Sequence, residues 1–311
     1  MTKVFIDGSA GTTGLRIHSR LADRKDISLI LLSDEVRKDP AARKEALNSA
    51  DIAFLCLPDP AAVESVSMIE NPNVAVIDTS TAHRTEEGWI YGFAELCGQR
   101  EKIASSKRIA NPGCYASGFV ALIAPLVAEG IVKRDANLSC FALTGYSGGG
   151  KKMIAEYEAQ DREALLGAPR LYGLTQTHKH LKEMVKVSGL DSAPAFCPVV
   201  APFYSGMEVN IPLFATDIKG TKSDIEALFA AYYKEGLVKF VTDADESGFM
   251  SASAYSGRDD MEIAVTGNED RILLTARFDN LGKGASGAAI QNMNILLGVD
   301  DKTGLSCEEE K

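Results

Sequence analysis

The chain has 311 residues and a formal net charge of −10, and its 45% hydrophobic and 24% charged content is that of an ordinary globular protein. The length favours two domains, and the acidic balance argues against a surface for nucleic acids or acidic membranes. No apolar run approaches the roughly 20 residues of a membrane span, and the first residues lack a signal-peptide pattern. The six cysteines are scattered without a CxxC pair, so we expect a cytoplasmic protein without disulfides.

The first third of the chain alternates short apolar runs with helical stretches. Runs rich in Val, Ile and Leu predict strands at residues 3–8, 27–33, 51–58, 74–80 and 107–112. The stretch 11–23 predicts the helix that follows the first strand. Strands that alternate with helices indicate a parallel sheet covered on both faces. We therefore expect a Rossmann-like, doubly wound α/β domain that binds a dinucleotide.

A glycine pattern marks the turn after the first predicted strand. Gly8, Gly11 and Gly14 form G-x-x-G-x-x-G at the start of the helix. Glycines allow a tight turn and let backbone amides approach a pyrophosphate, which the helix N-terminus also favours. The spacing departs from G-x-G-x-x-G, and a simple strand-to-helix turn is the alternative.

The end of the second predicted strand should select the cofactor's ribose. It reads Ser33-Asp34-Glu35-Val36-Arg37. An acidic residue there favours a free 2′-hydroxyl, whereas Ser33 and Arg37 can hold a 2′-phosphate. Both NAD and NADP stay open on this evidence, and we favour NADP.

Asn111-Pro112-Gly113-Cys114 is the sharpest local signal in the sequence. Pro112 and Gly113 end a strand, and Cys114 then falls in the first turn of an apolar helix that reaches about Gly130. Unpaired amides and the positive end of the helix dipole favour a thiolate at that position. The sequence therefore predicts a nucleophilic cysteine, with a buried structural cysteine as the alternative.

The pattern changes after Cys114. Alternating apolar and polar residues predict strands within residues 137–148, 193–216, 236–243, 262–268 and 271–280, and one helix lies around 223–236. These elements indicate an α+β domain with a mixed or antiparallel sheet.

Three regions follow from these patterns. Residues 1–113 form the dinucleotide-binding domain, and residues 114–280 form the catalytic, substrate and oligomerisation domain. Residues 281–311 contain a helix that returns to the first domain, and from Asp300 the acidic end is expected to be a solvated tail.

A glycine-rich turn follows the first strand of the second domain. Ser147, Gly148 and the cations Lys151 and Lys152 suit a phosphate or carboxylate. The same residues satisfy the G-x-S-x-G pattern of serine hydrolases, so ester hydrolysis by Ser147 is an alternative from another class.

Two of the four histidines stand together at His178 and His180. On a helix, His178 shares a face with Leu181, and His180 lies beside Glu183. A thiolate enzyme needs a proton donor and acceptor, and histidine titrates in the right range. No further ligand cluster supports a metal, so we predict none.

Seven segments together resemble the short form of the N-acetyl-γ-glutamyl-phosphate reductase family of arginine biosynthesis, in the semialdehyde dehydrogenase superfamily. They are DGSAGTTG, VIDTSTAHRT, YGFAEL, ANPGCYASG, GYSGGGKK, HKHLKEM and DNLGKGASGAAIQNMN, and they run over nearly the whole chain. NPGCY and KGASGAAIQNMN are the most specific of them. Two segments differ slightly from the family, which has ADFRL-like runs at TAHRT and often SGAG at SGGG.

The resemblance implies an NADPH-dependent oxidoreductase that converts an acyl phosphate into an aldehyde through a thioester on Cys114. It implies His178 as the preferred acid/base and His180 as the second choice. The residues expected near the substrate are Arg84, Ser147, Gly148, Lys151 and Glu183. The residues expected near the cofactor are Gly8, Ser9, Gly11, Thr12, Thr13, Gly14, Ser33, Arg37, Pro58 and Asn292. A homo-oligomer, dimer or tetramer, is also implied.

Four other functions stay open. Aspartate-semialdehyde dehydrogenase shares the architecture and the thioester chemistry, and a reductase of the longer aminoadipyl phosphate is closer still. The chain could also bind NADP as a sensor without catalysis, but the presence of both Cys114 and the histidine pair argues against that. Ser147 hydrolysis is the fourth.

Overall fold

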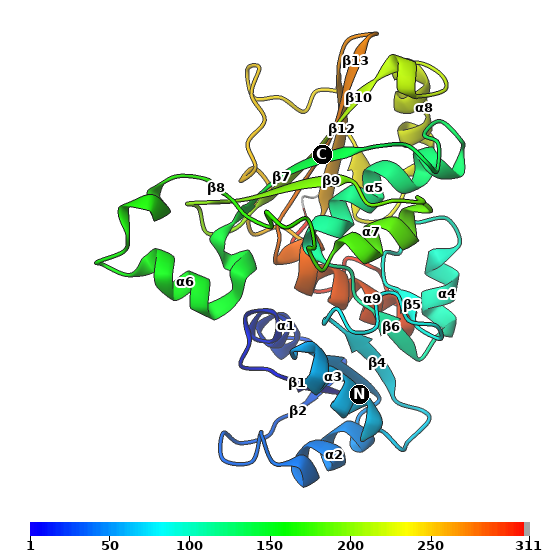
Figure 1. Cartoon of the computed structure of the whole chain (residues 1–311). Coiled ribbons are helices and arrows are strands. Elements are labelled where there is room, and N and C mark those ends of the chain that lie inside the picture. Colours follow the sequence, from blue (N-terminus) through cyan, green and yellow to red (C-terminus); the bar gives the residue numbers. More distant parts are fainter. Residues whose placement is uncertain (308–311) are drawn as a thin grey trace. The chain divides into compact units, whose positions relative to one another are not determined.

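The computed structural model describes residues 1–307 and divides them into two compact units (Figure 1). The first unit comprises residues 1–112 and 285–305, and the second comprises residues 113–284 with residues 306 and 307. Each unit has its own sheet. Within residues 1–307, no helix is both long and apolar enough to cross a membrane.

The first unit is built on a six-stranded sheet in which every neighbouring pair is parallel, in the order β2-β1-β3-β4-β6-β5. Its strands are β1 (Thr2–Asp7), β2 (Ile27–Ile30), β3 (Ile52–Leu55), β4 (Ala75–Asp78), β5 (Ile90–Tyr91) and β6 (Arg108–Ala110). Its helices are α1 (Thr12–Ala22), α2 (Pro40–Ser49), α3 (Asp59–Ser67), α4 (Gln99–Ser105) and α9 (Gly287–Leu297). This is the predicted Rossmann-like sheet.

Helices cover both faces of the parallel sheet. One apolar core contains residues of α1, α4 and α9 packed on the sheet, and a second core contains residues of α2 and α3 on the opposite face. β3 and β4 are buried on both faces, which is why they read as continuous apolar runs in the sequence.

The second unit is built on a mixed seven-stranded sheet in the order β11-β12-β13-β10-β7-β9-β8. The pairs β7–β9 and β11–β12 are parallel, and the others are antiparallel. Its strands are β7 (Ser139–Gly145), β8 (Arg170–Leu171), β9 (Ala195–Ala201), β10 (Met207–Phe214), β11 (Val238–Phe240), β12 (Met261–Gly267) and β13 (Arg271–Phe278). Its helices are α5 (Cys114–Ala128), α6 (Gly150–Glu158), α7 (Leu181–Ser188) and α8 (Lys222–Tyr232).

Helix α5 is the central helix of the second unit. It is buried along nearly its whole length, packs against α7 and α8, and lies on the same side of the sheet as those two helices (Figure 1). Pro125 stands in its last turn, and the carbonyl of Pro125 still accepts the N–H of Glu129. Burying this apolar helix fixes the place of its first residue, Cys114.

The expected solvated tail is wrong for the part of it that is described. Asp301 is buried, and its carboxylate accepts a hydrogen bond from Arg100 at 2.5 Å. Asn294 donates to the main-chain carbonyls of Asp301 and Thr303 at 2.9 Å each. The acidic composition of this segment suggested exposure to solvent. The segment instead forms a turn whose main-chain carbonyls accept hydrogen bonds from Asn294 of α9. Residues 308–311 lie outside the described residues.

Candidate active site

The turn between β1 and α1 is shaped by Gly8. Its φ is +86°, and a Cβ at this position would overlap the carbonyl of Cys56, so only glycine fits. The Gly11 N–H donates to the Gly8 carbonyl at 2.9 Å, and Gly11 is the N-cap of α1. The first turn of α1 contains three more predicted cofactor residues: Thr12, Thr13 and Gly14. A helix N-terminus behind a glycine turn is the arrangement that binds a pyrophosphate.

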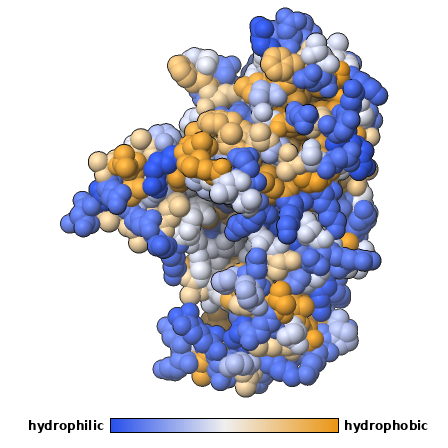
Figure 2. Space-filling view, viewed as in Figure 1, coloured by the Kyte–Doolittle hydropathy of each residue, from blue (hydrophilic) through white to orange (hydrophobic). Residues whose placement is uncertain are grey.

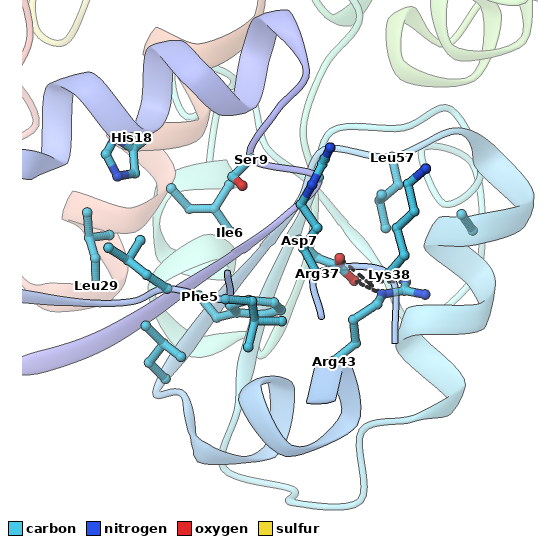
Figure 3. Close-up of a pocket in the computed structure, with 15 residues that line it drawn as sticks. Phe5, Ile6, Asp7, Ser9, His18, Leu29, Arg37, Lys38, Arg43 and Leu57 are labelled. Atoms are coloured by element: carbon cyan, nitrogen blue, oxygen red, sulfur yellow. Dashed lines mark hydrogen bonds and ion pairs between the residues drawn. The ribbon is translucent and has the colours of Figure 1, made fainter. Parts of the chain in front are cut away.

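A cavity of about 240 Å³ lies beside this turn (Figure 3). Its walls are largely apolar and come from β1, β2 and the residues after β3. Its polar lining includes Gly8, Ser9, His18, Arg37 and Lys38. An apolar slot with two cations beside a phosphate-binding turn has the chemistry that an adenosine phosphate requires.

Arg43 also lines this cavity, but a buried carboxylate neutralises its charge. Its Nη2 lies 3.0 Å from Asp7 Oδ2 (Figure 3). The same Nη2 also donates to Ser65 Oγ at 2.7 Å. The hydrogen bond to Asp7 raises the pKa of Arg43, against the effect of burial. Arg37, in contrast, pairs only with the exposed Asp34, and Lys38 forms no ion pair within residues 1–307.

The other predicted cofactor residues take different positions. Ser33 is exposed, donates to Glu35 at 3.2 Å and does not line the cavity. Pro58 is the N-cap of α3. Asn292 is fully buried in α9, where its Nδ2 donates to the Gly92 carbonyl at 2.9 Å and to Asn111 Oδ1 at 3.2 Å. Asn292 therefore anchors Asn111 within the first unit.

Cys114 is the first residue of α5, and Gly113 is its extended N-cap. The Gly113 N–H donates to Glu183 Oε2 at 3.1 Å. Glu183 is almost fully buried, and its Oε1 lies 4.0 Å from His180 Nε2. One carboxylate thus joins the helix start that carries Cys114 to one of the two histidines. Glu183 was predicted near the substrate, and in the structure its carboxylate contacts the Gly113 N–H and His180 Nε2.

Both histidines lie before α7, not on it. His180 is the N-cap of the helix, and its main-chain N–H donates to His178 Nδ1 at 3.2 Å. The expected shared helix face of His178 and Leu181 is therefore wrong, because the helix begins at Leu181. His180 and Glu183 do lie together, as expected. Both imidazoles pack against Tyr115, with ring centroids 6.0 Å away in each case.

His178 has a strongly perturbed titration. Burial, and next the charge of Lys179, lower its pKa to about 4. The bond that Nδ1 accepts leaves the proton of the neutral ring on Nε2. His178 is therefore a neutral hydrogen-bond donor near pH 7.

This shift predicts a pH effect on stability. The pKa of His178 is about 4 in the folded chain and about 6.5 when unfolded, so the unfolded chain binds the proton more tightly. Stability should fall as the pH drops from about 6.5 toward 4. In His178→Asn that part of the decline should be shallower, as thermal unfolding across this range would measure. Equal slopes in the two proteins would contradict the assignment.

Ser147 lies in the turn between β7 and α6 and is buried. Its Oγ accepts a hydrogen bond from Asn280 Nδ2 at 3.0 Å, and Gly148 lies close to the same amide. A hydrolase nucleophile donates its proton to a base, and Asn280 offers only a donor here. This arrangement does not support the hydrolase alternative.

The two lysines of the glycine-rich turn are exposed. Lys151 is open to solvent, and Lys152 lies 3.9 Å from Glu156. No group of three or more metal-ligating side chains occurs within residues 1–307.

Sequence reasoning missed the turn that follows β13. The buried Asp279 accepts the N–H groups of Leu281 and Gly282, and the Gly284 N–H donates to the Asp279 carbonyl. A Cβ on Gly284 would lie 3.0 Å from Cys114 Cβ. The turn therefore extends from Asn280, which donates to Ser147 Oγ, to Gly284 beside Cys114. The DNLGKGASG segment could have indicated this turn.

Family models match both parts of the chain. The model described as semialdehyde dehydrogenase, NAD binding domain, matches residues 34–106, and the one described as semialdehyde dehydrogenase, dimerisation domain, matches residues 114–280. N-acetyl-gamma-glutamyl-phosphate reductase 2 of Nostoc sp. is 46% identical over 97% of this chain and 99% of its own length. The Brucella ovis N-acetyl-gamma-glutamyl-phosphate reductase is 45% identical over 95% and 99%. The chain belongs to the N-acetyl-γ-glutamyl-phosphate reductase family.

Solved structures agree on the fold. Aspartate semialdehyde dehydrogenase II of Vibrio cholerae, complexed with ASA, aligns over 96% of this chain and 98% of its own with a TM-score of 0.73 at 15% identity. The Candida albicans aspartate semialdehyde dehydrogenase with NADP aligns over 96% and 99% with a TM-score of 0.68 at 13% identity. At such low sequence identity, the two structures support the fold of this chain and nothing about its function.

Proposed function

We propose that this chain reduces N-acetyl-γ-glutamyl phosphate to N-acetylglutamate 5-semialdehyde and inorganic phosphate, with NADPH, in arginine biosynthesis. The observation that carries the proposal is the link between Cys114 and His180 through Glu183 (Gly113 N–H to Oε2, 3.1 Å; His180 Nε2 to Oε1, 4.0 Å). Relatives of that name at 45–46% identity favour this substrate over aspartyl phosphate.

The first step forms a thioester. The Cys114 thiolate, stabilised at the N-terminus of α5, attacks the acyl carbon, and the C–O bond to phosphate breaks with release of inorganic phosphate. Arg84 and Lys151 supply the positive charge that holds the anionic substrate against the net charge of −10. A thioester accepts hydride more readily than a carboxylate, so the difficult reduction is divided into two steps.

The second step releases the aldehyde. NADPH, when bound, supplies the hydride that reduces the thioester carbonyl. The residues that fit it are the Gly8–Gly14 turn and the cations Arg37 and Lys38 at the adjacent cavity. A protonated histidine stabilises the oxyanion by transferring its proton to it. The histidine takes that proton back as the C=O bond re-forms, the C–S bond breaks and the Cys114 thiolate is restored.

We assign the acid role to His180, although the sequence alone prefers His178. The Glu183 carboxylate faces His180 Nε2 at 4.0 Å, and a nearby negative charge favours the protonated ring. His178, whose pKa is lowered to about 4, is a weak candidate for a protonated acid at neutral pH. It instead donates a hydrogen bond from Nε2.

The cavity supports NADP over NAD. Arg37 and Lys38 line it, whereas Asp34 and Glu35 do not. We expect Lys38→Glu to raise the KM for NADPH by ~10-fold or more while the KM for NADH changes little, because a charge-assisted bond to a 2′-phosphate contributes about 1.5–3 kcal/mol. Initial rates with each cofactor measure this. An equal effect on both cofactors would contradict the assignment.

We propose that the open face of the seven-stranded sheet forms a homo-oligomer. The face opposite α5, α7 and α8 exposes the sheet patch, which consists of Phe141, Leu171 and Phe214 at 46%, 52% and 57% exposure. Figure 2 shows apolar side chains gathered over β7, β8 and β9. The family model for this region is named a dimerisation domain.

Phe141→Asp should lower the mass measured by light scattering, because burying a charge opposes association. Val63→Asp, a similarly exposed position on α3, should leave that mass unchanged. A monomeric parent, or an unchanged mass for Phe141→Asp, would contradict the interface.

The scattered cysteines support our placing the reaction in the cytoplasm.

Reverse turnover tests the proposed function. N-acetylglutamate semialdehyde, phosphate and NADP should yield the absorbance of the reduced nicotinamide, and no signal should appear without phosphate. Aspartate semialdehyde and the one-carbon-longer aldehyde serve as competitors. Faster turnover of either competitor would replace the proposed substrate, and the absence of turnover with all three would leave only a binding role.

A further inference from the structure

A buried histidine–carboxylate pair lies at the end of β4 in the first unit, and the proposed mechanism does not use it. Asp78 is fully buried, and its Oδ2 lies 2.6 Å from His83 Nδ1. Asp78 also accepts the main-chain N–H of Ser80 at 2.9 Å and its hydroxyl at 2.7 Å. His83 is itself buried. One carboxylate therefore holds both ends of the turn 79–83.

Other contacts hold the same turn. The His83 ring stacks on Trp89, with ring centroids 4.0 Å apart and an interplanar angle of 16°. Thr81 donates to Asp59, in the first turn of α3, through its main-chain N–H and its hydroxyl. The Ala82 N–H donates to Ser80 Oγ at 3.2 Å. So many bonds around so short a segment leave its last residue little freedom.

Arg84 follows His83 directly in the chain. Its Nε donates to the Asn111 carbonyl at 2.9 Å, and its Nη2 donates to the Thr79 carbonyl at 3.1 Å. The Asn111 N–H in turn donates to the Asp78 carbonyl at 2.7 Å. Because a guanidinium is planar, two such bonds set the direction of its other N–H groups.

We propose that Asp78 and His83 are positioning residues that hold Arg84 in the orientation that binds the anionic substrate. The proposal rests on the proposed function, in which Arg84 binds the acyl phosphate. His83 acts through Arg84, not on the substrate: its Nδ1 is bonded to Asp78, and its ring face is covered by Trp89. Without the bond to Asp78, the turn 79–83 gains freedom and Arg84 binds the substrate less tightly.

A double-mutant cycle in the full-length enzyme tests this inference. The variants are His83→Phe, which keeps a stacking ring but loses the bond to Asp78, and Arg84→Ala, each alone and together. His83→Asn is the matched control, because its amide can still donate to Asp78. Trp89 is the only tryptophan, so an unchanged emission maximum shows that the turn in His83→Phe is still folded.

We expect Arg84→Ala and His83→Phe each to raise the KM for the acyl phosphate by ~10-fold or more, because that is the size of the effect of one hydrogen bond to a charged group. The kcat should change far less. His83→Asn should stay within about 3-fold of the parent enzyme, and His83→Phe should add almost nothing in the Arg84→Ala background.

If the KM increases of the two single variants multiply in the double variant, the positioning role of Asp78 and His83 is overturned, and Arg84 remains a substrate-binding residue. An unchanged KM in His83→Phe would overturn it equally. An unchanged KM in Arg84→Ala would remove both roles, and a parent enzyme without turnover would remove the proposed function and this inference with it.

Discussion

Replacing Cys114 with serine is expected to lower kcat by on the order of 10⁴-fold or more, the size of effect seen when a catalytic nucleophile is removed. A serine hydroxyl stays protonated at neutral pH and is therefore a much weaker nucleophile than a cysteine thiolate. Cofactor binding should persist, because the Gly8 turn and its cavity belong to the first unit. Steady-state rates and an NADPH titration of the variant measure the two properties.

Cys97→Ser is the matched control for this substitution. Cys97 is exposed, so a general effect of thiol loss or oxidation would appear there as well. We expect the control to keep the parent rate. Burial raises the pKa of Cys56 to about 12 and also raises the pKa of Cys140, so neither thiol competes as a nucleophile. Substantial turnover by Cys114→Ser would exclude Cys114 as the attacking group.

The second large effect is expected at His180. His180→Asn should lower kcat by about 10²–10⁴-fold, the usual contribution of a positioned proton donor. His178→Asn should cost much less, because a ring whose pKa is about 4 carries little of the imidazolium at neutral pH. Rates of both variants between pH 6 and 9 measure the difference.

The ranking of the two histidine variants decides the assignment. If His178→Asn loses more activity than His180→Asn, the acid role moves to His178. Glu183→Gln provides a further check, because it keeps an acceptor for the Gly113 N–H and removes the charge that faces His180. We expect it to shift the pH profile of kcat more than it changes thermal stability.

Most of the first unit could be predicted because its strands are buried on both faces. β3 and β4 read as unbroken apolar runs, and the glycine spacing marks the turn before α1. Cys114 could be placed at a helix start because Pro112 and Gly113 precede a long apolar helix. These are local signals, and they need no knowledge of distant partners.

The rest depends on contacts between distant residues. β5 and β8 are two-residue strands formed by pairing with neighbours, so they leave no periodicity in the sequence. The spacing of His178 suggested a helix, but α7 begins only at Leu181. The bond between Asn280 and Ser147 spans 133 positions, and that between Glu183 and Gly113 spans 70. Such pairings become visible only in the folded chain.

The central claim is that the acyl group passes through Cys114. The most direct measurement is the mass of the enzyme after it is mixed with N-acetyl-γ-glutamyl phosphate without NADPH, followed by peptide mapping. The account predicts an added N-acetylglutamyl group on the Cys114 peptide that hydroxylamine removes, that NADPH discharges as the aldehyde, and that Cys114→Ser lacks. An acyl group on another residue, or full turnover with no acyl-enzyme on Cys114, would contradict it.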